Sequence, residues 1–167
     1  MHAGLLLARL VVGLLMAAHG AQKLLGWFGG YGLAGVGSFF ETLGFRPGRL
    51  FAAVASLGET VGGLLLALGL FGPVGPALVV SVMIVAAMSV HWSHGLFAAS
   101  NGIEVPLLYA TAAAGLALTG PGAYSLDALL GLTPVWSSGV TLAVLAAGVL
   151  GALGALALRR VPQHATA

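Results

Sequence analysis

Five long apolar runs alternate along the chain with short segments that contain glycine, proline and charged residues. Each run is about 17–22 residues, enough to cross roughly 30 Å of hydrocarbon at 1.5 Å per residue of helix. Backbone groups in lipid have to be paired within their own segment, so the runs are predicted to be helices rather than open strands. The predicted membrane-spanning helices cover residues 4–25, 50–71, 73–92, 103–119 and 138–158.

The first run could instead be a secretory signal peptide. It lacks a basic leader and a clear small-residue cleavage site, and it carries Arg9, His19 and Lys23. Signal peptides have the opposite arrangement, with positive charge first and an uncharged apolar region after it. We therefore interpret the run as the first span.

Two connecting segments show patterns of their own. After the first span, apolar residues with 3-4-3 spacing predict a short amphipathic helix at the membrane surface, with polar residues on its other side. Its apolar positions are Leu33, Val36, Phe40 and Leu43, and its polar positions are Ser38, Glu41 and Thr42. Between the last two spans, Ser125 is a predicted helix N-cap, and we assign Asp127 to that cap rather than to chemistry.

Small residues four apart, such as Gly58 with Gly62 and Gly151 with Ala155, are typical of closely packed transmembrane helices.

Composition supports a membrane protein. Of 167 residues, 59% are hydrophobic and 6% are charged, whereas a soluble domain has about 25% charged residues. Intrinsic disorder is excluded because it requires low hydrophobicity. The absence of cysteine excludes disulfides and cysteine-bound iron–sulfur clusters in this chain. The few basic residues are dispersed, which gives no indication of nucleic-acid binding.

The distribution of basic residues predicts an orientation. Five spans place the first loop and the C-terminal tail on the same side, and these segments contain most of the basic residues: Lys23, Arg46, Arg49, Arg159 and Arg160. Because basic residues concentrate on the cytoplasmic side, the N-terminus is predicted outside and the C-terminus in the cytoplasm.

Polar residues within the spans are the candidates for function. A charge at this depth costs at least about 2.5–3.5 kcal/mol, so it is expected to face the bundle and to have a partner. His19 and Glu59 would lie about 9 Å and about 13 Å from the inner boundary, and Arg9 about 24 Å from it. Depth therefore favours His19 as the partner of Glu59, with Lys23, which shares a helix face with His19, as the second candidate.

His91 and Glu104 flank the next inner connection at the level of Lys23. We therefore predict one polar pocket in the inner half of the bundle, suited to proton transfer or to binding a quinone carbonyl. Its candidate ligand-binding or proton-relay residues are His19, Lys23, Glu59, His91 and Glu104, and the secondary candidates are Arg9, His94 and Asn101.

Two other chemistries fit the histidines poorly. Haem held by His19 and His91 would need both at one depth, but they differ by roughly 7 Å of helix rise. A metal at His91, His94 and Glu104 lacks a characteristic ligand spacing, so no metal is predicted. Catalytic residues are not identifiable.

At these residues the chain resembles the DoxX family of integral membrane proteins. The resemblance covers residues 4–131, a predicted DoxX-like four-helix transmembrane core, and leaves residues 132–167 as a fifth transmembrane helix with a short basic cytoplasmic tail. The residues that carry it are Arg9, the run 10–23 ending in His19-Gly20-Ala21-Gln22-Lys23, and residues 26–30, 38–40, 58–63, 91, 95–97, 101–104 and 120–127.

The resemblance implies an all-α, multi-pass protein of a bacterial or archaeal inner membrane, related to the small membrane subunit of thiosulfate:quinone oxidoreductase. The expected function is that of a membrane subunit of an oxidoreductase system, with quinone as the candidate cofactor. The alternatives are a non-catalytic scaffold or anchor for a partner protein and, third, a small transporter or channel. Expected partners are the lipid bilayer and an oxidoreductase subunit, and a homo-oligomer stays open.

Overall fold

The structure is a computed structural model that describes residues 2–160, and within this range every regular element is a helix. Residues 161–167, the end of the predicted basic tail, lie outside the described residues. The α-helices are α1 (His2–Leu25), α2 (Gly32–Thr42), α3 (Gly48–Leu68), α4 (Val74–Ala86), α5 (Glu104–Thr119), α6 (Leu126–Leu129) and α7 (Ser138–Ala157). Short helical turns are η1 (Trp27–Gly29), η2 (Ala87–His91), η3 (Trp92–His94), η4 (Ala98–Ser100) and η5 (Thr133–Val135).

All five predicted apolar runs are helices. Four of the helices are long and apolar enough to cross a membrane: α1, α3, the continuous stretch Val74–His94, and α7. The fifth, α5, is apolar but has 16 residues, or about 24 Å of helix. The all-helical membrane fold is therefore as predicted.

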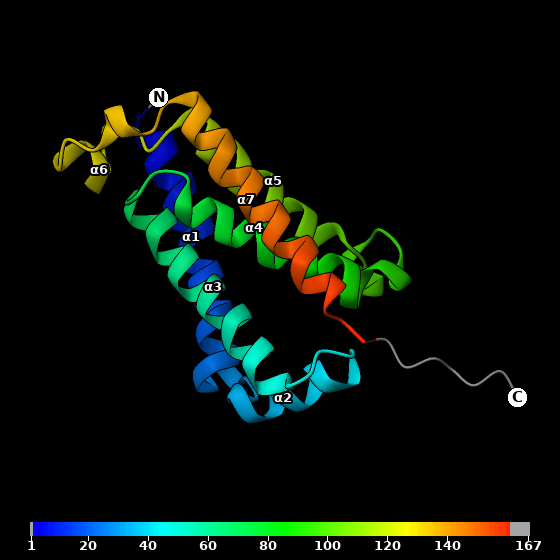
Figure 1. Ribbon diagram of the computed structural model, residues 1–167. Coiled ribbons are helices and arrows are strands. Elements are labelled where there is room, and N and C mark those ends of the chain that lie inside the picture. The colour runs from blue at the N-terminus through cyan, green and yellow to red at the C-terminus, as the bar shows by residue number, and fades with distance from the viewer. Residues whose placement is uncertain (1, 161–167) are drawn as a thin grey trace, which may run out of the picture.

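The helices form two groups that meet at α3 and α4. In one group α1 and α3 pack side by side, and α2 lies across their lower end; in the other, α4 carries α5 and α7 (Figure 1). The α2 segment is a helix, as its 3-4-3 spacing predicted. The division of the chain at residues 131 and 132 stays a prediction, and α7 packs against α4.

Small residues bring α1 and α3 into backbone contact. A Cβ atom added to Gly13 would lie 2.5 Å from the Gly63 carbonyl oxygen, and one added to Gly63 would lie 2.5 Å from the Ala17 nitrogen. Such distances are far below van der Waals contact, so only glycine fits at these positions. This close approach matters for function because it holds the end of α1 directly against α3.

The predicted Gly58–Gly62 pair faces α4. A Cβ atom on Gly62 would lie 3.0 Å from the Gly75 oxygen, and one on Gly58 would lie 3.0 Å from Val82 Cγ2. On α7, the closest approach is at Gly148, whose added Cβ would be 2.7 Å from the Ala77 oxygen. Gly151 of the other predicted pair makes only an ordinary contact.

One end of the molecule is held by Arg9 and Asp127. Arg9 is 2% exposed, and its terminal nitrogens donate to the carbonyl oxygens of Pro121 and Tyr124. Asp127 accepts from the backbone nitrogens of Phe71 at 2.9 Å and Gly72 at 2.6 Å. These bonds join the α3–α4 turn and the α5–α7 connection to α1.

The capping prediction for this segment is correct for Ser125 and wrong for Asp127. Ser125 Oγ accepts from the Ala128 nitrogen at 3.1 Å at the start of α6. Asp127 lies in the first turn of α6, as expected, but its carboxylate accepts from two backbone amides of the turn after α3, so the side chain joins α6 to that turn and does not cap α6. Asp127 has a structural role, as expected, through a different contact.

The opposite end joins α7 to the loop between α2 and α3. Arg159 Nε donates to the Leu43 oxygen at 2.5 Å, and the Arg160 nitrogen donates to the Gly44 oxygen at 2.8 Å. The first loop and the end of α7 therefore lie at the same end of the molecule, which is the grouping that five crossings require. Which end faces the cytoplasm stays a prediction.

Candidate functional site

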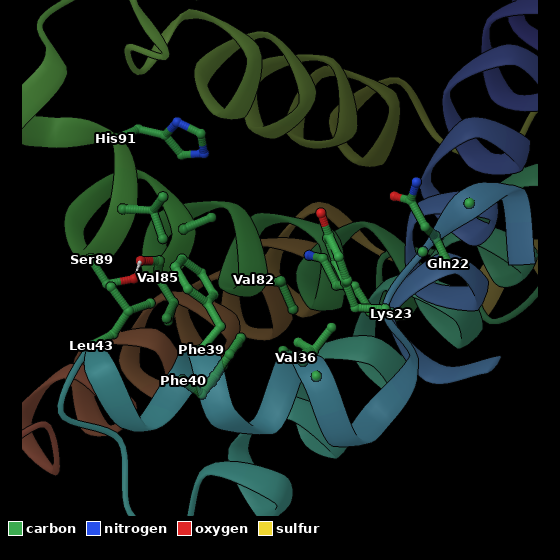
Figure 2. Close-up of a pocket in the computed structure, with 17 residues that line it drawn as sticks. Gln22, Lys23, Val36, Phe39, Phe40, Leu43, Val82, Val85, Ser89 and His91 are labelled. Carbon is green, nitrogen blue, oxygen red and sulfur yellow. Dashed lines mark hydrogen bonds between the residues drawn. The ribbon is translucent and has the colours of Figure 1, made fainter. Parts of the chain in front are cut away.

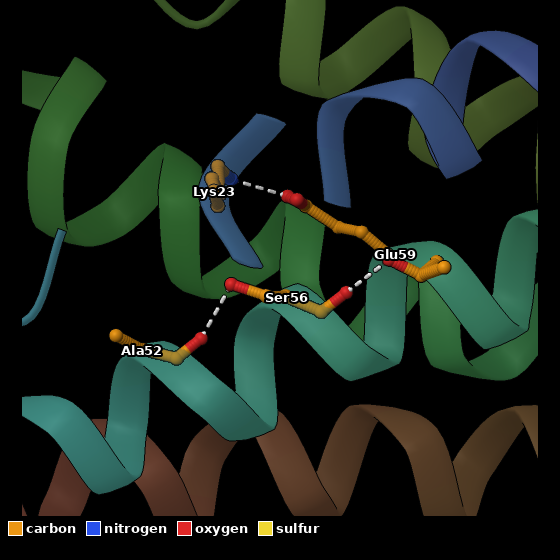
Figure 3. Close-up of polar contacts among 5 residues, drawn as sticks. Lys23, Ala52, Ser56 and Glu59 are labelled. Carbon is orange, nitrogen blue, oxygen red and sulfur yellow. Dashed lines mark hydrogen bonds and ion pairs between the residues drawn. The ribbon is translucent and has the colours of Figure 1, made fainter. Parts of the chain in front are cut away.

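The polar centre of the bundle is an ion pair between α1 and α3. Lys23 Nζ lies 2.5 Å from Glu59 Oε1 (Figure 3). The Glu59 side chain is 1% exposed and that of Lys23 is 31% exposed. The second carboxylate oxygen, Glu59 Oε2, is buried without a hydrogen-bond partner among the described residues. Glu59 therefore depends on Lys23 for its charge balance.

The hydroxyl groups next to Glu59 do not contribute to its environment as donors. Ser56 Oγ donates to the Ala52 oxygen at 2.6 Å, and Thr60 Oγ1 donates to the Ser56 oxygen at 2.8 Å. Both hydroxyl groups thus donate to backbone oxygens of α3, and Figure 3 shows this bond for Ser56. Such bonds within a helix satisfy the hydroxyl and leave it no second proton to give.

The preference for His19 as the partner of Glu59 is wrong. His19 is exposed, and its ring packs edge-on against Tyr109 of α5, with centroids 6.0 Å apart. Depth along α1 favoured His19, but the direction of the side chain decided the contact. His19 points toward α5, whereas Lys23, one turn later, faces α3 and spans the remaining height with its long side chain.

A cavity of about 580 Å³ lies beside the ion pair, between α2 and the end of α4. Its volume is within the range of about 300–1,000 Å³ that is usual for small-molecule sites. Most of its lining is apolar, and Lys23 forms part of the wall (Figure 2). The lining residues are Gln22, Lys23, Gly29, Gly30, Tyr31, Gly35, Val36, Phe39, Phe40, Leu43, Ala55, Val82, Val85, Ala86, Ser89, Val90 and His91.

Helix α2 forms the floor of this cavity. Its predicted apolar positions Val36, Phe40 and Leu43 line it, together with Phe39 (Figure 2). These apolar side chains of α2 therefore face α4 across the cavity, while Gly37 of α2 packs closely against Gly48 of α3. The amphipathic pattern that predicted a surface helix also supplies a wall of the site.

His91 lies at the other side of the cavity from Gln22, next to Ser89 (Figure 2). His91 Nδ1 is 2.7 Å from the Asn101 carbonyl oxygen. Since a carbonyl can only accept, Nδ1 carries the proton in this bond. In the neutral imidazole Nε2 is then an acceptor, which suits a hydroxyl or a proton from a bound molecule.

A change in helix winding positions His91. After α4 the chain continues as a single π-helical segment, Ala87–His91, and then tightens into the turn Trp92–His94. Wider turns of this kind are frequent at functional sites. Here the segment contributes Ser89, Val90 and His91 to the cavity wall.

The remaining candidates lie elsewhere. Glu104 Oε2 accepts from the Ala98 nitrogen at 2.7 Å, and His94 Nδ1 donates to the Val90 oxygen at 3.0 Å. Asn101 contributes its backbone carbonyl to His91, while Arg9 lies at the opposite end of the bundle. Of the five principal candidates, Lys23 and His91 line the same cavity, and Glu59 is linked to it only through its ion pair with Lys23. No group of three metal-binding side chains occurs within residues 2–160.

The sequence reasoning missed the apolar lining of the site. Gln22, Tyr31 and Ser89 also add polar atoms to the wall, and none of them was a candidate. Ser89 and His91 precede the end of a span that is otherwise apolar, a signal that was available. The cavity itself had no signal, because it depends on how α2 is placed relative to α4.

A protein-family model matches the part of the chain that contains the cavity. The DoxX family model matches residues 4–92, more than half of the chain. Every residue that lines the cavity lies inside this segment, as does Glu59. Asn101, Glu104 and the segment 120–127 lie outside it. Comparisons with curated proteins and with solved structures gave no match. By the family match, the chain belongs to the DoxX family of membrane proteins.

Proposed function

We propose that the chain is a membrane subunit of an oxidoreductase system that binds a quinone in the cavity between α2 and α4. The observation that carries the proposal is the cavity of about 580 Å³, which is largely apolar and has Lys23 and His91 in its wall. A quinone is an apolar ring and tail with carbonyl oxygens that accept hydrogen bonds. When bound, it would supply two-electron redox chemistry that no side chain of this chain provides.

The electrostatics of the wall favour a neutral ligand. Glu59 balances the charge of Lys23 at 2.5 Å, so the pair presents an N–H donor with no net charge. An anionic ligand would have to compete with a buried carboxylate for the same ammonium group, at a large desolvation cost. A carbonyl oxygen accepts from Lys23 while the ion pair stays intact.

The chain can donate and accept protons at two places on the cavity wall. Lys23 Nζ offers a proton in a hydrogen bond, and Glu59 holds that ammonium group in position. His91, fixed by the Asn101 carbonyl, offers Nε2 as an acceptor. Relation to thiosulfate:quinone oxidoreductase, location in a bacterial or archaeal inner membrane, and a redox partner subunit are parts of the proposal.

The transporter alternative has less support from the described residues. At the Arg9 end, the second cavity measures about 20 Å³, the space of about one water molecule. The two cavities share no lining residue. The scaffold alternative needs no cavity and predicts that filling the cavity has no consequence.

Filling the cavity tests the proposal. Ala86 lines it, so Ala86→Phe should weaken binding of a decyl-tailed benzoquinone by more than about ten-fold, equivalent to about 1.4 kcal/mol. Ala143 on α7 is exposed, and Ala143→Phe is the matched control that should leave binding unchanged. The measurement is a titration of the purified full-length protein, followed by native mass spectrometry.

Two outcomes would reject the quinone site. One is no binding to the unmodified protein, which leaves the scaffold alternative. The other is equal binding by Ala86→Phe and Ala143→Phe, which would place the quinone elsewhere on the surface. Glu59→Gln is expected to lower quinone-linked turnover in the native membrane without loss of the helical fold, and normal turnover would remove Glu59 from the site.

A further inference from the structure

Four arginines gather at the end of the molecule where α7 meets the α2–α3 loop. Arg46 and Arg49 lie in that loop and in the first turn of α3, and both are exposed. Arg159 and Arg160 follow α7 and are bonded to Leu43 and Gly44 of the same loop. Segments more than 100 residues apart in sequence thus meet at one turn, where the end of α7 approaches the loop that follows α2 (Figure 1).

The acidic residues of the chain leave these arginines without ion-pair partners. The chain has four Asp and Glu residues. Glu59 pairs with Lys23, while Glu104 and Asp127 accept from backbone amides far from this turn. Glu41 is the one acidic group nearby, and it accepts from the Gly48 nitrogen at 3.2 Å. Within residues 2–160, Lys23–Glu59 is the only ion pair.

Arg159 is held in a fixed orientation. Its Nε donates to the Leu43 oxygen at 2.5 Å, and its guanidinium carbon lies 6.0 Å from the centre of the Phe45 ring. Phe45 is itself 1% exposed. The terminal nitrogens of Arg159 make no hydrogen bond to the described residues, so a planar fork of N–H donors stays available for an acceptor.

We propose that this turn binds the phosphate headgroup of an anionic phospholipid, with Arg159 as the oriented contact and Arg46 and Arg49 as supporting charges. Both α3 and α7 are candidate membrane spans that begin or end here, which places the arginines at the level of lipid headgroups. Every phospholipid has a phosphate at that level, but only in an anionic lipid is its charge not balanced by a cationic group of the same headgroup, so clustered arginines favour the anionic lipid. None of these arginines lines the quinone cavity, and lipid binding is measured independently of quinone binding.

The test compares lipids that differ only in their headgroup. The purified full-length protein is titrated with phosphatidylglycerol and with phosphatidylcholine of the same acyl chains, and bound lipid is counted by native mass spectrometry. We expect a preference for phosphatidylglycerol. One arginine near an anionic headgroup contributes about 1 kcal/mol, or about five-fold in affinity, so Arg159→Gln should reduce the preference at least about five-fold.

Arg160→Gln is the matched control, because it removes the same charge from the adjacent position, where the side chain is exposed and only the backbone is bonded. It should reduce the preference by at most the about five-fold that one unoriented charge contributes, and by less than Arg159→Gln, which also removes the oriented fork of donors. Equal losses in the two variants would indicate diffuse attraction and overturn the site. Equal binding of both lipids by the unmodified protein would also overturn it.

The variant Arg159→Gln also loses the hydrogen bond to the Leu43 oxygen. Circular dichroism and the elution volume in size-exclusion chromatography show whether its fold is disturbed. The double variant Arg46→Gln/Arg49→Gln then carries the test, since neither side chain contacts α7 through a hydrogen bond. It should lower the preference for phosphatidylglycerol at least about five-fold. An unchanged preference in this variant would overturn the proposed site.

Discussion

Glu59 has a single partner because its neighbours on α3 are already satisfied. The hydroxyls of Ser56 and Thr60 donate to α3 itself, so among residues 2–160 the only charged donor that reaches the carboxylate is Lys23 from α1. A buried carboxylate without a partner is costly, whereas the side chain of Lys23 is 31% exposed and can turn toward the surface. The two members of the pair are therefore unequal in their effect on stability.

Removing Lys23 should destabilise the protein more than removing both charges. We expect Lys23→Met to lower the free energy of unfolding by about 3 kcal/mol, the low end for a broken buried pair, because Lys23 is partly exposed. The double variant Lys23→Met/Glu59→Gln should regain at least half of that loss. Unfolding in mixed micelles measures both, and equal stability of the single and double variants would contradict a buried, charged Glu59.

At the scale of elements, the site depends on how closely α1 and α3 approach. Glycines at Gly13 and Gly63 remove the side chains that would separate the two backbones. The short distance between the helices lets the Lys23 side chain reach α3 from the end of α1. Helix α2 behaves in the opposite way, since it stands off from α4 and leaves the cavity between them. The close contact between α1 and α3 thus lies next to the cavity between α2 and α4.

Adding a methyl group at the α1–α3 contact should be costly. Gly13→Ala places a Cβ atom 2.5 Å from the Gly63 oxygen, and overpacking of this kind costs about 1–3 kcal/mol. Gly115 on α5 has open space around its Cβ position and is the matched control. Gly115→Ala should be neutral or stabilising by up to about 1 kcal/mol. Thermal unfolding in detergent would measure both, and equal stabilities would argue against the close contact.

At the scale of the whole molecule, hydrogen bonds hold the connections between helices together at two opposite ends. Arg9 and Asp127 gather the α3–α4 turn and the α5–α7 connection at one end. Arg159 and Arg160 gather the first loop and the end of α7 at the other. This grouping matches five crossings of the membrane, including one by the shorter helix α5. The basic residues at the second end predict that it faces the cytoplasm.

The absence of cysteine makes this topology directly testable. Single cysteines at Thr42 and Tyr124, both exposed and at opposite ends, should react from opposite sides with a membrane-impermeant maleimide. We expect Tyr124→Cys to label in intact cells and Thr42→Cys only in inverted vesicles. Labelling of both from one side would contradict an odd number of crossings between them, and reversed labelling would contradict the predicted orientation.

The sequence by itself determined the helices, because a long apolar run in lipid has one way to pair its backbone. It also identified Lys23, Glu59 and His91 as candidates, since polar residues in apolar spans are few. It did not determine the partner of Glu59, because depth along α1 does not report which way a side chain points. Only the tertiary structure decided that Lys23 faces α3, that His19 faces α5, and that α2 stands off from α4. These outcomes depend on contacts between helices distant in sequence, which no local pattern encodes.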